Sequence, residues 1–76
     1  MPLASRRMGE QGTVQLRVLV GTDGLPKDVT VQRSSGFARL DEQAVWAMKR
    51  ARFKPQTDHG VPIEWIVIAP LQYEIE

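Results

Sequence analysis

Two stretches of the chain alternate between apolar and polar residues, which is the pattern of a half-buried β-strand. The first stretch is Thr13–Val20, whose apolar face holds Val14, Leu16, Val18 and Val20. The turn-forming residues Gly21-Thr22-Asp23-Gly24 follow directly, and Val29 and Val31 then resume the alternation. Because glycines supply the positive φ angles that tight turns need, this segment predicts a β-hairpin.

The second alternating stretch begins at Ile63, after a polar loop at Gln56–Gly60. Its predicted inward face holds Ile63, Trp65, Val67, Ala69, Leu71, Tyr73 and Ile75. Pro70 lies inside this stretch. Since proline has no backbone N–H to donate to a neighbouring strand, it is tolerated mainly at sheet edges or bulges. The last strand is therefore predicted to have one free or irregular edge.

Between the two stretches the apolar residues take helical spacing. The expected buried stripe holds Leu40, Ala44, Ala47, Met48 and Ala51. Asp41 is the expected N-cap and Pro55 the expected end of this helix. A shorter helical pattern over Leu3–Gln11 predicts one or two turns of helix that stop at Gly12.

These elements predict an α+β fold in the order helix, strand, strand, helix, strand. We expect a small antiparallel sheet of three strands with the helices packed on one face. The 76 residues suffice for one domain, so residues 1–76 are expected to form a single unit with a thin core. No cysteine is present to stabilise it by a disulfide.

Charge and hydropathy exclude little about the partner. Ten Lys and Arg residues stand against nine Asp and Glu residues, and a net charge of +1 creates no overall attraction to nucleic acid or anionic membranes. Trp65–Ala69 is far shorter than the ~20 apolar residues needed to span a bilayer. Any membrane anchor or export signal is thus expected to lie outside this segment.

No group of residues has the pattern of a catalytic, cofactor or metal site. His59 is the one histidine and lies in the polar loop beside Asp58, whereas a zinc site needs three or four ligands. Ser34 and Ser35 are better explained as turn residues than as nucleophiles. We therefore expect a binding module without enzymatic activity, cofactor or metal.

A basic cluster follows the predicted helix and could in principle hold a single-stranded nucleic acid. The cluster, with its aromatic neighbours, consists of Lys49, Arg50, Arg52, Lys54, Trp46 and Phe53. Basic and aromatic side chains together are typical of single-strand binding. The near-zero net charge favours a solvated helix end with Phe53 in the core, so nucleic-acid binding is the weaker alternative and the role of the cluster stays open.

Several short motifs, in their order and spacing, resemble the C-terminal domain of TonB-type energy transducers. They are Gly12-Thr13-Val14 with Val18, Asp23-Gly24, Ser34-Ser35-Gly36 followed by Leu40-Asp41, Arg52-Phe53-Lys54-Pro55, and Gly60-Val61-Pro62 with Pro70-Leu71-Gln72-Tyr73. Pro2 holds the place of the proline in the family's Tyr-Pro pair, with Met1 where the tyrosine would be. Ala51 stands where many members carry tryptophan.

The resemblance implies a periplasmic domain of a protein that is anchored in the Gram-negative inner membrane. Such domains bind the TonB box of outer-membrane transporters as an added strand on the last strand, and ExbB and ExbD supply energy through the missing N-terminal part. The cargo of these transporters includes siderophores, haem and cobalamin. The implied partner-binding residues are Pro2, Ile66, Val67, Ile68, Ala69, Leu71, Gln72 and Tyr73.

The sequence leaves one alternative family open and gives one prediction about oligomeric state. A TolA-type periplasmic coupling domain, which has a related fold, is the nearest alternative family. In addition, a free last strand predicts that two copies of the isolated domain pair or exchange their last strands in a homodimer.

Overall fold

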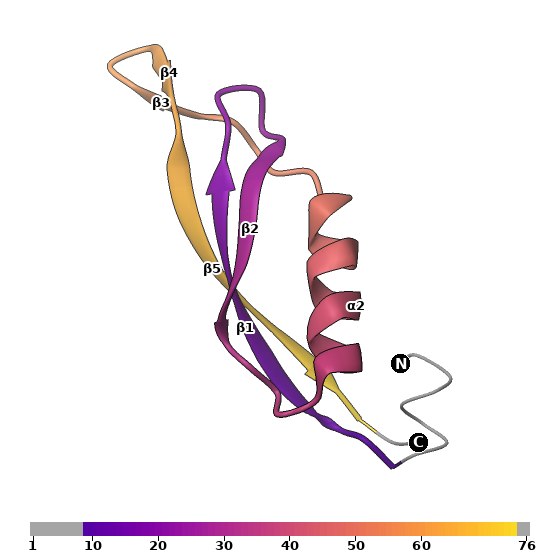
Figure 1. Cartoon of the computed structure of the whole chain (residues 1–76). Coiled ribbons are helices and arrows are strands. Elements are labelled where there is room, and N and C mark those ends of the chain that lie inside the picture. The colour runs from indigo at the N-terminus through magenta and orange to yellow at the C-terminus, as the bar shows by residue number, and fades with distance from the viewer. Residues whose placement is uncertain (1–8, 75–76) are drawn as a thin grey trace.

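The computed structural model describes residues 9–74, which fold into one sheet, one helix and a small separate hairpin (Figure 1). The elements are β1 Gly12–Val20, β2 Pro26–Arg33, α2 Ala38–Lys49, β3 Gln56–Asp58, β4 Val61–Ile63 and β5 Trp65–Tyr73. The sheet is antiparallel with the order β2-β1-β5, and β3 pairs with β4. The α+β class and the three-stranded sheet with a helix on one face are confirmed.

The predicted order of elements is only partly right. Residues 3–8 of the predicted first helix lie outside the described residues, and residues 9–11 are not helical. The predicted polar loop instead forms most of the β3–β4 hairpin. His59 and Gly60 have φ angles of 51° and 82°, and two consecutive positive φ angles are what a two-residue hairpin turn requires. The last strand begins at Trp65 rather than Ile63 because Ile63 belongs to β4.

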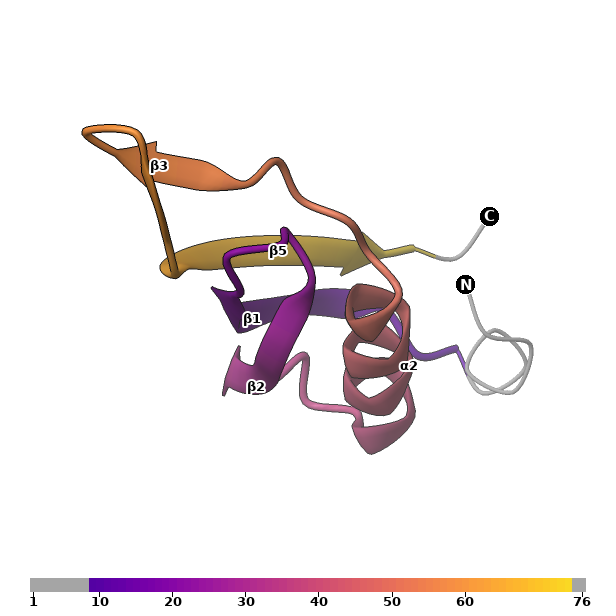
Figure 2. The same cartoon turned by 90° about the horizontal axis from the view of Figure 1, so that it is seen from above.

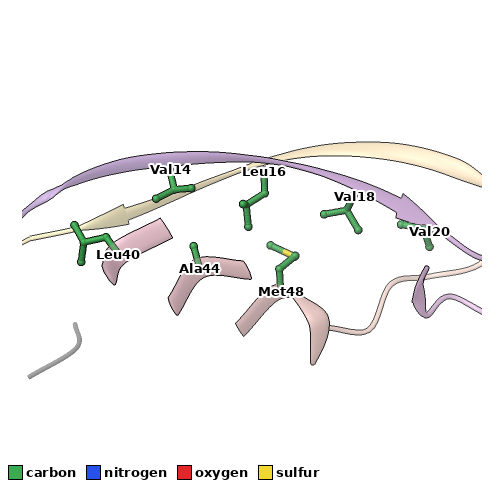
Figure 3. Close-up of a cluster of buried hydrophobic side chains, with 7 residues drawn as sticks. All are labelled: Val14, Leu16, Val18, Val20, Leu40, Ala44 and Met48. Atoms are coloured by element: carbon green, nitrogen blue, oxygen red, sulfur yellow. The ribbon is translucent and has the colours of Figure 1, made fainter. Parts of the chain in front are cut away.

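The core lies between β1 and α2 (Figure 3). Its buried residues are Val14, Leu16, Val18, Val20, Leu40, Ala44 and Met48. The alternation of β1 puts its four residues on one face, and the i, i+4, i+8 spacing in α2 puts three on one side of the helix. The helix lies over β1 and β2 (Figure 2), so β5 is outside its main contact area.

The turn between β1 and β2 holds the segment that follows the helix. The backbone N–H of Phe53 donates to the carbonyl of Gly24 at 3.0 Å. Gly24 has a φ of +84°, and a Cβ at this position would lie 2.3 Å from the carbonyl oxygen of Phe53. Only glycine fits both requirements, because other residues rarely adopt this φ and none could approach so closely. The chain leaving α2 is thereby held beside the first hairpin.

Both ends of the helix differ from the prediction. The helix begins at Ala38, with Phe37 as an N-cap that makes no side-chain capping bond, so Asp41 is not the N-cap. It ends at Lys49, well before Pro55. The guanidinium of Arg52 donates to the backbone carbonyls of residues 50 and 51, at 3.1 and 3.0 Å. This side chain satisfies two carbonyls just beyond the helix, and Pro55 lies too far along the chain to set the helix end.

Asp41 instead connects the first turn of the helix to the preceding loop. Its carboxylate accepts hydrogen bonds from the backbone N–H of Ser35 at 2.9 Å, from the Ser35 hydroxyl at 2.8 Å and from the Ser34 hydroxyl. Partial burial alone would raise the pKa of Asp41, but these hydrogen bonds outweigh burial and lower the pKa below its ordinary value. The ionised carboxylate therefore stabilises the β2–α2 connection.

Asp41→Asn is expected to lower the free energy of unfolding at pH 7 by about 1 kcal/mol, because a neutral acceptor makes weaker hydrogen bonds than a carboxylate. Because the pKa of Asp41 is lower in the folded state than in the unfolded state, its ionised carboxylate stabilises the fold at pH values above the unfolded-state pKa. This stabilisation is lost as the pH falls through the folded-state pKa. The difference between the two proteins should thus shrink below about pH 4. Urea unfolding of both proteins at pH 7 and pH 3 measures it, and a difference independent of pH would contradict this role.

Candidate functional site

The outer edge of β5 is the main unpaired feature of the sheet. One side of β5 pairs with β1 along its whole length, from Gly12↔Tyr73 to Val20↔Trp65. Within residues 9–74 no strand pairs with the other side. Its nine residues, WIVIAPLQY, include no charged side chain. A long, uncharged edge strand is a ready template for another strand, because its backbone N–H and C=O groups lack partners.

Two observations indicate which residues direct their backbone groups to this edge. The backbone N–H and C=O groups of successive strand residues point to alternate sides of the strand. Pro70 is tolerated where an N–H would point away from the ladder, so the backbone groups of the even-numbered residues of β5 are expected to point to the outer edge. Independently, the Thr30 hydroxyl on β2 donates to the carbonyl of Arg17 at 3.4 Å, which places that carbonyl on the β2 side of β1. We infer that Ile66 and Ile68 present free N–H donors.

The other edge of the sheet, on β2, is far less open to a new strand. It begins with Pro26 and carries Lys27, Asp28 and Arg33. Its pairing with β1 is irregular at two places, between Gln15 and Leu16 and between Leu19 and Val20. Proline, charges and bulges are the features with which natural edge strands avoid pairing. The two edges are therefore unequal, and β5 is the one suited to strand addition.

The side chains of β5 divide between the two faces of the sheet. The odd-numbered residues are half-buried on the helix face, where Val67, Ala69, Leu71 and Tyr73 pack against the core. The even-numbered Ile66 and Ile68 are 48% and 44% exposed on the opposite face. An added strand would thus meet apolar side chains on both faces near the middle of β5, which extends the contact beyond backbone bonds.

The β5 end nearest the β3–β4 hairpin is held by aromatic packing and an ion pair. The rings of Phe53 and Trp65 meet edge to face with centroids 6.4 Å apart. The Lys27 ammonium donates to the Glu64 carboxylate at 2.5 Å, and this hydrogen bond raises the pKa of Lys27. At the opposite end, burial raises the pKa of Tyr73. These contacts position β5 without using its outer edge.

All of the predicted partner-binding residues from Ile66 to Tyr73 lie on this one strand. The structure brings together Ile66, Val67, Ile68, Ala69, Leu71, Gln72 and Tyr73. Pro2 lies outside the described residues. Val67, Ala69, Leu71 and Tyr73 pack against the core, and their backbone groups are inferred to point toward β1, so the even-numbered residues offer both backbone groups and side chains to a partner.

The residues considered for chemistry lie apart from one another. The His59 side chain is 95% exposed at the tip of the β3–β4 hairpin, with Nδ1 2.8 Å from a carboxylate oxygen of Asp58. Ser34 and Ser35 lie in the β2–α2 connection, and their hydroxyls donate to the carboxylate of Asp41. Among residues 9–74 no three acidic, histidine or cysteine side chains gather where they could hold a metal ion. No helix in that range is long and apolar enough to cross a membrane.

The basic cluster is partly used within the domain. Arg52 bonds to carbonyls at the helix end, and the Arg50 guanidinium lies over the Trp46 ring, 4.6 Å from its centroid. Phe53 is half-buried against the core, as predicted. An apolar groove of about 310 Å³ lies beside Trp46, between α2 and β2, and was not predicted from the sequence. The signal was present as the spacing Glu42, Val45, Trp46, Lys49, which puts four residues on one side of a helix.

A small α+β domain with one open, uncharged edge strand belongs to the class of modules suited to binding extended segments by strand addition. Residues 2–75 match the family described as Gram-negative bacterial TonB protein C-terminal. The chain belongs to this family. The match covers nearly the whole chain, and it favours the TonB type over the TolA alternative.

Curated relatives agree with this assignment. The chain is 38% identical over 74 residues to Protein tonB2 of Pseudomonas aeruginosa, covering 97% of this chain and 27% of that protein. It is 29% identical over 75 residues to Protein TonB of Vibrio cholerae, covering 99% and 31%. It is 39% identical over 66 residues to Protein TonB of Neisseria meningitidis serogroup C, covering 84% and 24%. The chain therefore spans less than a third of the length of these relatives.

Proposed function

We propose that this chain is the receptor-binding domain of a TonB-type energy transducer. Its task is to take up the TonB box of an outer-membrane transporter as an additional strand on the free edge of β5. The observation that carries this proposal is the unpaired, uncharged nine-residue edge in a chain of the TonB family. Affinity from backbone hydrogen bonds demands little of the partner's side chains, so one edge can serve several receptors.

The proposal extends to the pathway of energy. The domain lies in the periplasm, at the end of a protein that is anchored in the inner membrane, and ExbB and ExbD act on the rest of that protein. Proton-motive force then reaches the transporter mechanically and drives uptake of siderophore, haem or cobalamin cargo. The family assignment supports this role. In this role the domain acts as a mechanical coupling between the two membranes.

A pull transmitted through the domain would load the sheet along its strands. The bound segment would pair with β5, and β5 pairs with β1 over nine residue positions. Force entering through the added strand is thus carried by a continuous antiparallel ladder whose bonds share the load. The buried face of β1, which is the central strand, ties this ladder to α2. The arrangement suits a mechanical coupling.

Titration of the isotopically labelled chain with a TonB-box peptide tests the proposal. We expect the largest amide chemical-shift changes at residues 66–73, followed by residues of β1. A peptide of the same composition with prolines at alternate positions is the matched control, because it cannot form a ladder. Absence of shifts at millimolar peptide, or shifts confined to α2, would overturn the proposal. Oligonucleotide binding that weakens with salt would instead favour the nucleic-acid alternative.

The same free edge also supports the predicted homodimer through paired or exchanged last strands. Such a dimer would use the groups that the receptor segment needs, so the two modes exclude each other. A TonB-box peptide is therefore expected to dissociate any dimer of this kind.

A further inference from the structure

The side of α2 next to β2 carries a short stripe of residues that the receptor-binding site leaves unused, with Val45 half-buried against the core. Glu42, Val45, Trp46 and Lys49 follow the spacing i, i+3, i+4, i+7, so they share one side of the helix. Together with Asp41 and Val31 of β2 they line the groove of about 310 Å³. The Trp46 side chain is 55% exposed and Val31 is 40% exposed. This is an apolar patch with an acidic end and a basic end.

The charged ends of this stripe form no ion pair with the other residues that the structure describes. Among residues 9–74, the ion pairs join Lys27 to Glu64, Arg39 to Glu10 and His59 to Asp58, and none involves Glu42 or Lys49. Both of these residues are exposed. Seven residues of helix separate them by about 10 Å along the axis. The stripe is therefore polarised along the helix, with Val45 and Trp46 between the charges.

The spacing of the stripe is symmetric about its midpoint, between Val45 and Trp46. If a second α2 lies antiparallel across this point, Glu42 of each helix faces Lys49 of the other. Val45 of each helix then faces Trp46 of the other. A two-fold interface needs a patch that complements itself in this way, since each contact occurs twice with the residues exchanged. The order of charged and apolar residues along the stripe fulfils that condition for a second copy of this chain.

Arg50 restricts the ring of Trp46, the aromatic side chain at the centre of the stripe. Its guanidinium lies over the Trp46 ring at 4.6 Å from the centroid, which limits the orientations of the ring. A partly ordered aromatic side chain loses less conformational entropy on binding. Tryptophan is also among the residue types that most often contribute strongly to protein–protein interfaces.

We propose that α2 forms a two-fold, antiparallel helix-to-helix dimer of this chain, centred on Val45 and Trp46, with Glu42 paired to Lys49 of the partner copy. The interface lies on the β2 side of the domain, at the opposite edge of the sheet from β5. The dimer therefore leaves both β5 edges open. A pair of domains joined in this way presents two receptor-binding edges at once, which raises the effective concentration of the second edge after the first has bound.

Sedimentation equilibrium of the chain, with charge-reversed variants, tests the proposal. Glu42→Lys makes both ends of the stripe basic, and Lys49→Glu makes both ends acidic. Each variant alone should self-associate about tenfold more weakly than the unchanged chain, since two attractive pairs become repulsive. An equimolar mixture of the two should regain association to within about threefold, because both pairs are then attractive again.

Three controls keep this test decisive. Lys54→Glu makes the same change of net charge as Lys49→Glu, but outside the stripe, and should leave association unchanged. Trp46→Ala should abolish association, while a preserved amide spectrum shows that the domain stays folded. Ile68→Pro, which blocks pairing at the β5 edge, should not affect the dimer. A chain that is monomeric at millimolar concentration, a mixture that does not recover, or a dimer that a TonB-box peptide dissociates would overturn the proposal.

Discussion

Ile68→Pro should weaken binding of a TonB-box peptide at least about tenfold while the domain remains folded. The N–H of Ile68 is inferred to point away from β1, so its loss costs no hydrogen bond within the sheet. The side chain is 44% exposed and lies outside the buried core. The proline removes a donor near the middle of the edge and places its ring where the peptide backbone would approach.

The expected loss follows from one missing hydrogen bond and one carbonyl of the peptide left without a partner. These terms together amount to about 1.5–4 kcal/mol, which weakens affinity by at least about tenfold. Calorimetric titration measures the affinity, and circular dichroism checks the fold. Because the ladder and not the side chain is decisive, Ile68→Ala should weaken binding only a few-fold.

Val67→Pro provides the opposite comparison. Val67 is the residue before Ile68, and its N–H is inferred to point toward β1, where Val67 pairs with Val18. A proline there breaks the central ladder and should unfold much of the population. If instead Ile68→Pro unfolded the chain and Val67→Pro did not, the inferred backbone direction would be reversed. If Ile68→Pro stayed folded and bound peptide normally, the edge would not be the binding site.

The parts of the fold that the sequence predicted correctly are those in which pattern and burial coincide. The four apolar residues of β1 repeat with period two and all are fully buried. Leu40, Ala44 and Met48 repeat with helical spacing and all are buried as well. Ala47, which was placed on the same stripe, is exposed because the contact with the sheet is narrow. One edge of the sheet was also foreseen, since Pro70 signals it without any knowledge of strand order.

Other features depend on contacts between distant residues and leave weak local signals. Asp41 lies inside the helix and its carboxylate bonds back to Ser34 and Ser35, so the cap that the local pattern predicted is not the cap in the structure. The β3–β4 hairpin was predicted as a loop, since a His59-Gly60 turn lacks the Asn-Gly or Asp-Gly pair that usually marks such turns. The groove beside Trp46 requires Val31 from another element, so helix spacing alone did not reveal it.

The largest effect on stability is expected for Leu16→Ala, at the centre of the core. Leu16 is fully buried on the central strand, where its neighbours across the sheet are Val31 and Ala69. Truncation of such a leucine costs about 2–5 kcal/mol through lost burial and the cavity left behind. A domain of this size has a total stability on the order of 4–11 kcal/mol, so the variant should be substantially destabilised.

Leu19→Ala on the same strand is the matched control. Leu19 lies on the opposite face, is only half-buried and pairs with Asp28 and Ile66. Its truncation should cost about 1 kcal/mol or less. Urea unfolding of both variants measures the difference, and equal losses would contradict the assignment of the core to one face of the sheet.

Leu16→Ala and Ile68→Pro distinguish the role of the β5 edge in peptide binding from the role of the core in stability. Leu16→Ala leaves the β5 edge and its donors unchanged, so the folded fraction of this variant should bind a TonB-box peptide with the affinity of the unchanged chain. Its apparent affinity falls only in proportion to the folded fraction, and added peptide should restore folding by mass action. Ile68→Pro should show the reverse, a folded population that peptide does not stabilise. Thermal unfolding of both variants with and without peptide therefore distinguishes a site on the edge from a site that merely requires an intact domain.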